Sequence, residues 1–198
     1  MEHSALGTRR QRIRVATPGD IAGIARVHVE AWHETYPGMF PAFVLDALSY
    51  AEREEQWTDA LTAGGACLFV AEVDEQIVGF AAGGPNREDL ADEYPGELWA
   101  IYLLQARQGR GLGRTLFEAV RAWLHARELE PFLLWAVADN PACGFYERLG
   151  GTRIVTQPAD IRGAQVIECA YAWPRTALLQ SEAQFEAGTN SKVDGSTW

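Results

Sequence analysis

A short segment rich in glycine and arginine carries the residue types that bind anionic groups. It runs from Gln105 to Arg114 as QARQGRGLGR, with glycines at 109, 111 and 113 and arginines at 107, 110 and 114. An apolar stretch typical of a buried strand precedes it, and a helical pattern follows it. Free N–H groups at a helix N-terminus attract anions, and glycine lets a phosphate come close to the backbone. The segment therefore predicts a site for a phosphorylated cofactor.

The spacing of these glycines excludes two common phosphate-binding motifs. A P-loop requires Gly-Lys-Ser or Gly-Lys-Thr, which does not follow here. The G-x-G-x-x-G pattern of dinucleotide-binding proteins fails at its last position, which falls on Arg114 or Leu116. The residues from Gln108 to Gly113 instead fit the pattern Q/R-x-x-G-x-G/A. The cofactor is therefore expected to be of another kind.

A second motif follows about thirty residues later, with Asn140-Pro141-Ala142 and then GFYERLG from Gly144 to Gly150. In this order, the two motifs resemble the Gcn5-related N-acetyltransferase (GNAT) family over residues 13–173. The resemblance implies an α/β domain of mixed α+β type, in which helices flank a central, mostly antiparallel, splayed sheet of about seven strands. It also implies acetyl-coenzyme A as co-substrate and no metal. The cofactor would lie between the central strand at 97–104 and the parallel strand at 132–137.

The resemblance implies two sets of contacts to acetyl-coenzyme A. Backbone amides would hold the pyrophosphate at Gln108, Gly109, Arg110, Gly111, Leu112, Gly113 and Arg114. The pantetheine arm would pair with the strand edge at Tyr102, Leu103 and Leu104, as an added strand does, and would hydrogen-bond Asn140. Family members commonly carry a bulge in this strand. We therefore expect the Leu103 amide to face the thioester carbonyl and to stabilise the negative charge that develops there.

Direct acetyl transfer to an amine needs two proton movements, and the resemblance suggests a residue for each. A lysine-like amine, with a pKa of about 10.4, is protonated at neutral pH and must lose a proton. Glu97 is the predicted base, because many relatives place a glutamate at the start of this strand, often acting through water. Tyr146 is predicted to return a proton to the leaving thiolate. The structural alternatives are a solvated carboxylate for Glu97 and aromatic packing for Tyr146.

The segment from Trp32 to Tyr36, WHETY, is the predicted acceptor site. In this family the loop between the first two helices lines the acceptor pocket, which implicates Trp32, Glu34 and Tyr36. The alternative is core packing for Trp32 and surface exposure for Glu34. Glu34 and an acidic loop at 84–95 favour a cationic acceptor. We therefore expect an acetyl-coenzyme A-dependent N-acetyltransferase for small primary amines. A non-catalytic coenzyme A sensor and a protein or peptide N-acetyltransferase remain open.

The hydrophobic pattern predicts the elements that position these residues. Helical spacing covers residues 21–36, 50–62 and 113–127, with a short helix after Pro41 and another that starts at Asn140 and Pro141. Strands are expected at 13–16, at 67–73 and 77–83 as a hairpin, and at 98–104 and 132–137 as a buried parallel pair. The segments 152–157 and 165–173 predict an antiparallel pair around a turn at 158–163. We expect one domain at 13–174, a loose segment at 1–12 and a flexible extension at 175–198.

Composition narrows the class of protein further. The 198 residues are 47% hydrophobic and carry a net charge of −10, which argues against nucleic-acid binding because that needs clustered positive charge. Three cysteines without CxxC spacing predict neither a disulfide framework nor a zinc site. No apolar run suits a membrane span, and residues 1–14 lack the apolar stretch of a signal peptide. We expect a cytoplasmic protein with no membrane partner, for which a homodimer is a compatible assembly.

Overall fold

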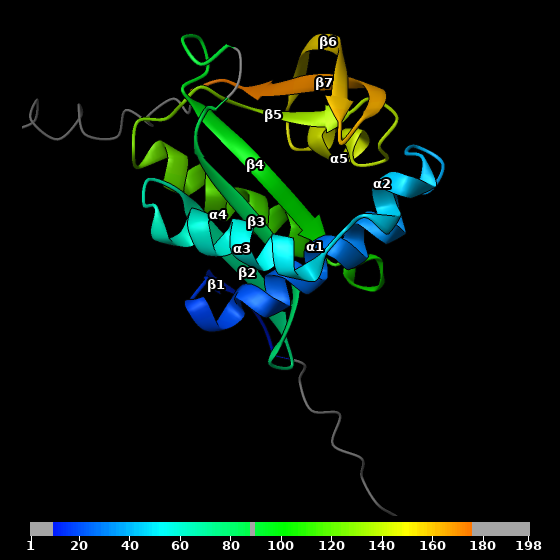
Figure 1. Ribbon diagram of the computed structural model, residues 1–198. Helices are drawn as coiled ribbons and strands as arrows, with labels where there is room; N and C mark the ends of the chain where they lie inside the picture. The colour runs from blue at the N-terminus through cyan, green and yellow to red at the C-terminus, as the bar shows by residue number, and fades with distance from the viewer. Residues whose placement is uncertain (1–9, 88–89, 176–198) are drawn as a thin grey trace, which may run out of the picture.

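The computed structural model describes residues 10–87 and 90–175. Its centre is one seven-stranded sheet in the order β1-β2-β3-β4-β5-β7-β6 (Figure 1). The strands are β1 (Gln11–Val15), β2 (Cys67–Val73), β3 (Gln76–Pro85), β4 (Gly96–Leu103), β5 (Phe132–Val137), β6 (Thr152–Ile161) and β7 (Ala164–Trp173). The helices are α1 (Ile21–Thr35), α2 (Ala42–Asp46), α3 (Tyr50–Thr62), α4 (Leu112–His125) and α5 (Cys143–Arg148), with short 3₁₀ turns η1 (Pro18–Asp20) and η2 (Gln105–Arg107).

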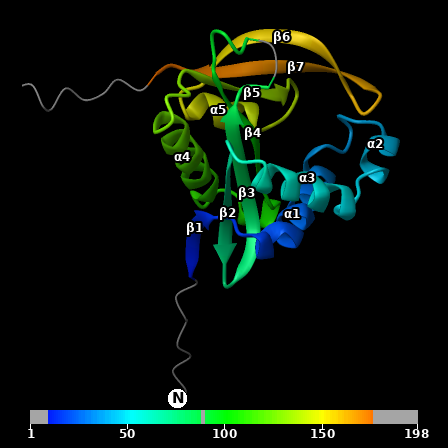
Figure 2. The same ribbon diagram turned by 60° about the vertical axis from the view of Figure 1, so that its left-hand side comes forward.

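Helices cover both faces of the sheet. Figure 2 shows α4 on one face and α1 with α3 on the other. Helix α4 buries Leu116, Phe117 and Val120 in a core with β5 and β7, because its apolar side chains recur on one side of the helix. Helix α1 buries Ile24 and Val27 in a second core on the opposite face. The sheet therefore lies between two apolar layers.

The sheet opens between β4 and β5. These strands are parallel, and they pair only at Gly96 with Phe132 and at Glu97 with Leu133. Beyond these pairs, β4 stays paired with β3, while β5 pairs with β7 along its whole length from Phe132 to Val137. Each strand thus follows its own half of the sheet. The splayed, mostly antiparallel sheet predicted from the sequence is confirmed.

The structure moves several predicted boundaries. Strand β1 begins at Gln11, inside the segment expected to be loose, and residues 1–9 and 176–198 lie outside the described residues. Helix α5 begins at Cys143, because a turn at Pro141 and Ala142 comes first. Strand β6 continues through Pro158, where a turn was expected, and Pro158 pairs with Ile167. Proline is tolerated there because β6 is the edge of the sheet and has no neighbour on its outer side.

None of the helices within residues 10–87 and 90–175 is long and apolar enough to cross a membrane.

Candidate active site

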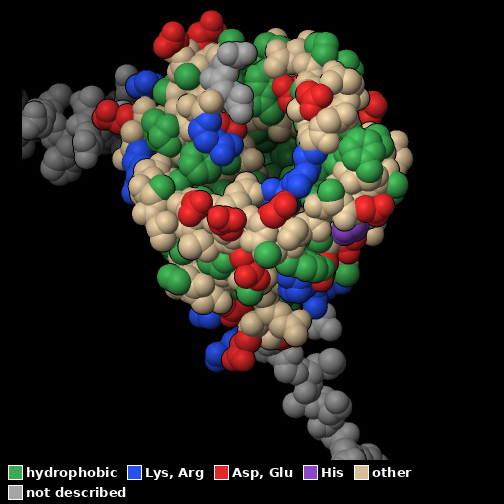
Figure 3. Space-filling model, viewed as in Figure 1, with side chains coloured by type: hydrophobic (Ala, Val, Ile, Leu, Met, Phe, Trp, Pro, Cys, Tyr) green, Lys and Arg blue, Asp and Glu red, His purple; other side chains and the backbone are tan. Residues whose placement is uncertain are grey.

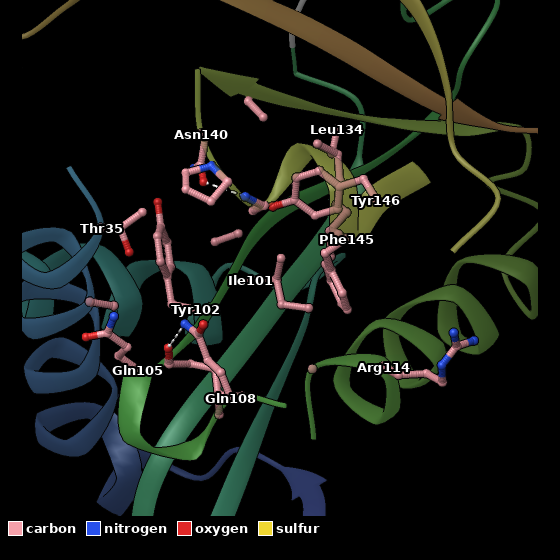
Figure 4. Close-up of a pocket in the computed structure, with 18 of the residues that line it drawn as sticks. Thr35, Ile101, Tyr102, Gln105, Gln108, Arg114, Leu134, Asn140, Phe145 and Tyr146 are labelled. Atoms are coloured by element: carbon pink, nitrogen blue, oxygen red, sulfur yellow. Dashed lines mark hydrogen bonds between the residues drawn. The ribbon is translucent and has the colours of Figure 1, made fainter. Parts of the chain in front are cut away.

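A cavity of about 600 Å³ occupies the gap between β4 and β5. Its walls come from β4, β5, the end of α1, the η2 segment, the start of α4 and the residues around α5. Figure 4 shows Ile101 and Tyr102 of β4, Gln108 and Arg114 of the glycine-rich segment, and Asn140 and Tyr146 near α5 around this cavity. The two sequence motifs, separated by about thirty residues, therefore meet across one space.

The edge of β4 presents alternate residues to the cavity. The Leu104 N–H donates to the Val78 carbonyl of β3 at 3.0 Å. Hydrogen bonding alternates along an antiparallel pair, so the backbone groups of Leu103 and Ile101 face away from β3, into the gap. The backbone groups of Tyr102 turn toward β3, and those of Leu104 are bound by the Val78 carbonyl and the Arg107 N–H, so the predicted pairing of pantetheine with this edge rests on Ile101 and Leu103 and stays a prediction. The Tyr102 side chain still lines the cavity.

Strand β4 carries the expected bulge at an earlier position than Leu103. Ala82 pairs with Ala100, but Gly83 pairs with Leu98, so Trp99 is the extra residue. The Leu103 carbonyl accepts a hydrogen bond from Gln108 Nε2 at 3.0 Å. Gln108 thus ties the glycine-rich segment to the strand, and the Leu103 N–H is left facing the gap. That this amide meets the thioester stays a prediction.

The glycine-rich segment has room for a phosphate at its backbone. Gly109 and Gly111 have φ values of 72° and 84°, and a Cβ placed on either would meet no atom within 4 Å. Gly111 directly precedes α4, whose first N–H groups have no partner within the helix. A positive φ strains residues other than glycine. The open backbone and the helix N-terminus fit the pyrophosphate of the predicted cofactor.

Other residues of this segment have different roles. The Leu112 side chain is buried in the core beneath α4, so only its backbone could meet a ligand. A Cβ at Gly113 would lie 3.4 Å from the Phe145 ring, so this glycine allows α4 to pack closely on α5. Arg114 lines the cavity, whereas Arg110 is exposed outside it.

The segment around α5 brings Asn140 and Tyr146 to the cavity. Asn140 Oδ1 accepts from the Ala142 N–H at 2.8 Å, and its Nδ2 donates to the Tyr36 hydroxyl at 3.2 Å. The Asn140 side chain therefore fixes the turn before α5 and joins it to the end of α1. Burial raises the pKa of the Tyr146 phenol above its usual value, so the hydroxyl keeps its proton at neutral pH.

The three predicted acceptor residues have separate surroundings. Tyr36 lines the cavity, and burial raises the pKa of its phenol. Trp32 is buried in an aromatic cluster, where its indole N–H donates to the Tyr102 hydroxyl at 3.0 Å. Glu34 is exposed at the cavity wall, where its carboxylate accepts from the Gln105 N–H at 2.7 Å. Trp32 and Glu34 thus hold Tyr102 and the η2 segment in place.

Glu97 lies in a neighbouring recess of about 300 Å³ rather than in the wall of the larger cavity. It is only 4% exposed, and its carboxylate accepts from the backbone N–H and the guanidinium of Arg87, both at 3.1 Å. Arg87 also stacks on Trp99 at 4.2 Å. To act as a base, the Glu97 carboxylate must therefore first lose its contact with Arg87 and accept the incoming amine instead. Of the predicted acidic loop, Glu88 and Asp89 lie outside the described residues.

Residues that the sequence did not single out complete both spaces. Arg148 lines the larger cavity, Trp135 lines both spaces, and β6 and β7 contribute Gln157, Asp160 and Glu168 to the recess. Gln157 pairs with Glu168, which pairs with Val137 of β5, so the side chains of Gln157, Glu168 and Val137 share one face of the sheet. Only the register of the strands brings these residues together. Figure 3 shows a hollow on the face seen in Figure 1, with hydrophobic side chains at its floor and charges of both signs around it.

No group of three or more histidine, cysteine, aspartate or glutamate side chains in the described ranges could hold a metal ion.

Several known proteins are similar to this chain in sequence or in fold. The model of the acetyltransferase (GNAT) family matches residues 24–151. The uncharacterized N-acetyltransferase YuaI of Bacillus subtilis is 34% identical over 170 residues, which cover 85% of this chain and 96% of YuaI. The PaiA N-acetyltransferase of Thermoplasma acidophilum, solved in complex with coenzyme A, has a TM-score of 0.61 at 16% identity and covers 81% of this chain and 98% of its own.

YncA of Salmonella typhimurium, described as a putative acetyltransferase with its cofactor acetyl-CoA, has a TM-score of 0.66 at 21% identity. The match covers 87% of this chain and 98% of YncA. These structural likenesses support the fold, and the family model and YuaI add the sequence evidence. The chain therefore belongs to the GNAT family of acetyltransferases.

Proposed function

We propose that this acetyl-coenzyme A-dependent N-acetyltransferase transfers the acetyl group directly to the primary amine of a small, cationic molecule. The observation that carries the proposal is the gap between β4 and β5. Its larger cavity meets the glycine-rich segment and Arg114, and the neighbouring recess is lined by Glu97, Asp160 and Glu168. A phosphorylated cofactor and a positively charged acceptor can thus lie in adjoining spaces of opposite electrostatic character.

The residues around the larger cavity suit the cofactor in several ways. Gly109, Gly111 and the N-terminus of α4 would hold the pyrophosphate, and Arg114 and Arg148 would add positive charge. The backbone of Ile101 and Leu103 would pair with the pantetheine arm. Acetyl-coenzyme A supplies an activated acetyl thioester at this place. The predicted role of the Leu103 N–H is to stabilise negative charge on the thioester oxygen.

The protein must first remove a proton from the acceptor amine. Glu97 is the proposed base, directly or through water, because it is a buried carboxylate in the recess where the amine would bind. Arg87 holds the same carboxylate. A cationic acceptor brings a second positive charge to Glu97 and can replace Arg87 as its partner. This exchange couples acceptor binding to release of the base.

The protein must then supply a proton to the leaving thiolate. Tyr146 is the proposed donor, since its phenol lines the cavity and stays protonated at neutral pH. Its position on α5 is fixed by the turn that Asn140 organises. Asn140 is thus proposed as a positioning residue, and the hydrogen bond to pantetheine expected from the sequence would use its remaining N–H.

Calorimetry and a thiol-release assay test the proposal together. Calorimetry should detect acetyl-coenzyme A binding to the wild-type protein. Small cationic amines should then release free thiol faster than neutral amines or peptides. The proposed reaction would be contradicted if the protein bound acetyl-coenzyme A but none of the amines caused release of thiol. Faster release with peptides would contradict the proposed acceptor class alone.

A further inference from the structure

Trp135 stands where the cofactor cavity meets the acidic recess. It lies on β5, two residues beyond Leu133, the last residue of β5 that pairs with β4. Its side chain shares the face of Leu133 and Val137, since side chains alternate along a strand. Val137 packs with Trp32 of α1 and with Tyr36, which follows α1, so this is the face of the sheet that α1 covers. Trp135 is also the residue that lines both spaces.

The indole nitrogen of Trp135 is a buried donor without an acceptor. Within the described part of the chain, Trp135 Nε1 has no hydrogen-bond partner. Other indole N–H groups are paired at 3.0 to 3.1 Å, those of Trp32, Trp57, Trp99 and Trp173. An unmade hydrogen bond of a buried donor lowers stability, so each such donor in a folded protein needs an explanation, and a partner supplied by a bound molecule is one. Unlike these four indole groups, Trp135 has a free N–H that a ligand could accept from.

The chemistry of the reaction limits what this donor can meet. The attacking nitrogen must keep its lone pair free for the acetyl carbon, so an N–H group bound to that nitrogen would block attack. The partner is therefore an oxygen atom. A hydroxyl group fits best, because it accepts from the indole and at the same time donates to a carboxylate of the recess, such as Glu168.

We propose that Trp135 determines acceptor specificity by donating its indole N–H to a hydroxyl group next to the reacting amine. This inference rests on the proposed function and narrows its substrate class to hydroxylated cationic amines, such as amino alcohols and amino sugars. The ring borders both spaces while its nitrogen is buried. The proposed contact requires the ring to turn about its Cβ–Cγ bond as the acceptor enters, so that the N–H meets the ligand.

A matched pair of acceptors tests the hydroxyl requirement, 1,3-diamino-2-propanol against 1,3-diaminopropane. Wild-type protein should show a kcat/KM about tenfold higher for the hydroxylated amine, the usual effect of one hydrogen bond to a buried donor. Trp135→Phe should remove this preference by slowing the hydroxylated amine alone. Trp123→Phe, a matched change on α4 outside both spaces, should keep the preference.

The outcomes separate this inference from the proposed function. Equal rates for the two amines in wild-type protein would overturn the role of Trp135 and leave N-acetylation of amines intact. An equal loss for both amines in Trp135→Phe would also overturn it, since the indole would then act on something other than the hydroxyl. Failure of every amine in the panel would overturn the proposed function itself.

A spectroscopic measurement tests the same contact without turnover. The chain has 7 tryptophans, and the indole ¹⁵N–¹H signal missing from Trp135→Phe identifies that of Trp135. With coenzyme A present, 1,3-diamino-2-propanol should shift this signal downfield, and 1,3-diaminopropane should not. A signal that responds to neither amine, or equally to both, would overturn the proposal.

Discussion

The Tyr146 hydroxyl is the proposed general acid, and one substitution can test this role. Tyr146→Phe keeps the ring and removes the proton donor. The kcat value should fall about 100-fold, as expected for loss of a general acid, while the Kd of acetyl-coenzyme A stays within about twofold. Stopped assays of thiol release and calorimetry measure the two effects separately.

The control for this variant is Tyr171→Phe. Tyr171 is a fully buried tyrosine whose hydroxyl donates to Glu147 at 3.0 Å, outside the cavity lining. Its loss should change the free energy of unfolding and leave kcat intact. A Tyr146→Phe protein with wild-type kcat would show that the thiolate takes its proton from another source.

His28 makes a prediction about stability rather than catalysis. The Trp57 indole donates to its Nδ1 at 3.0 Å, and its ring stacks on Tyr102 at 4.8 Å. Burial lowers the pKa of His28 from 6.5 to about 3, with smaller contributions from Arg53 and Arg162. The folded protein thus binds fewer protons than the unfolded chain below pH 6.5. The contribution of neutral His28 to the free energy of unfolding is complete above pH 6.5 and is lost as the pH falls toward 3.

The size of the His28 effect follows from linkage. When the pH is lowered from 7 to 5, the low pKa of His28 should decrease the free energy of unfolding by about 2 kcal/mol. His28→Asn retains an acceptor for the Trp57 indole but does not titrate. Urea denaturation should therefore show the stability gap between wild type and variant narrowing by this amount at pH 5. A constant gap would mean that His28 is charged in the folded protein.

Local sequence predicts those candidate site residues whose placement depends on their own segment. The glycines at 109 and 111 have the positive φ values that a phosphate cradle requires, and Tyr146 reaches the cavity on its own short helix. Trp135 and Glu168 could not be found in this way, because their roles depend on which strand lies beside which. Glu34 has a suitable charge, yet its carboxylate is bound by the Gln105 N–H.

At the scale of elements, the junction of the glycine-rich segment with α4 is the most sensitive. Gly111 is the residue directly before α4 and has a φ of 84°. Gly111→Asp adds a negative charge next to the expected pyrophosphate, and repulsion over a few ångströms should weaken acetyl-coenzyme A binding on the order of 100-fold or more. Calorimetry of the variant measures the loss directly.

Backbone strain must be separated from charge in this experiment. Gly64, in the loop between α3 and β2, has a φ of 74° and equally open surroundings. Gly64→Asp should carry a similar strain and melt at a temperature close to that of Gly111→Asp, but it should bind the cofactor normally. Retained affinity in Gly111→Asp would place the pyrophosphate elsewhere.

The elements themselves follow closely from the sequence where periodicity is strong. Helix α3 has the predicted bounds because Trp57 and Leu61 keep helical spacing and Gly64-Gly65 follow its end, and strand β5 has them because it is a continuous apolar run. Strand β6 was predicted too short, because Pro158 indicates a turn unless the strand is known to be an edge. The β4 bulge at Trp99 was expected in the strand but not at that residue, since it depends on the register with β3.

At the scale of the whole molecule, the two spaces and the state of the cysteines favour direct transfer in a ternary complex. Burial raises the pKa of Cys67 to about 12 and that of Cys169 to about 11. Both thiols are buried and protonated at neutral pH, so neither is a ready nucleophile. The third cysteine, Cys143, is also buried, and its thiol donates to the Val137 carbonyl at 3.5 Å. The open gap between β4 and β5 instead lets the amine meet the acetyl group without a protein carrier.

This arrangement predicts sequential kinetics. Initial rates at several fixed amine concentrations should give intersecting double-reciprocal lines, because both substrates must be bound before chemistry occurs. Labelled coenzyme A should not exchange into acetyl-coenzyme A when the amine is absent, since no acetylated protein would form. Parallel lines, or exchange without the amine, would show that a protein side chain carries the acetyl group. In that case the adjoining spaces would be occupied in turn rather than together, and the proposed release of Glu97 from Arg87 by the acceptor would lose its place in the reaction.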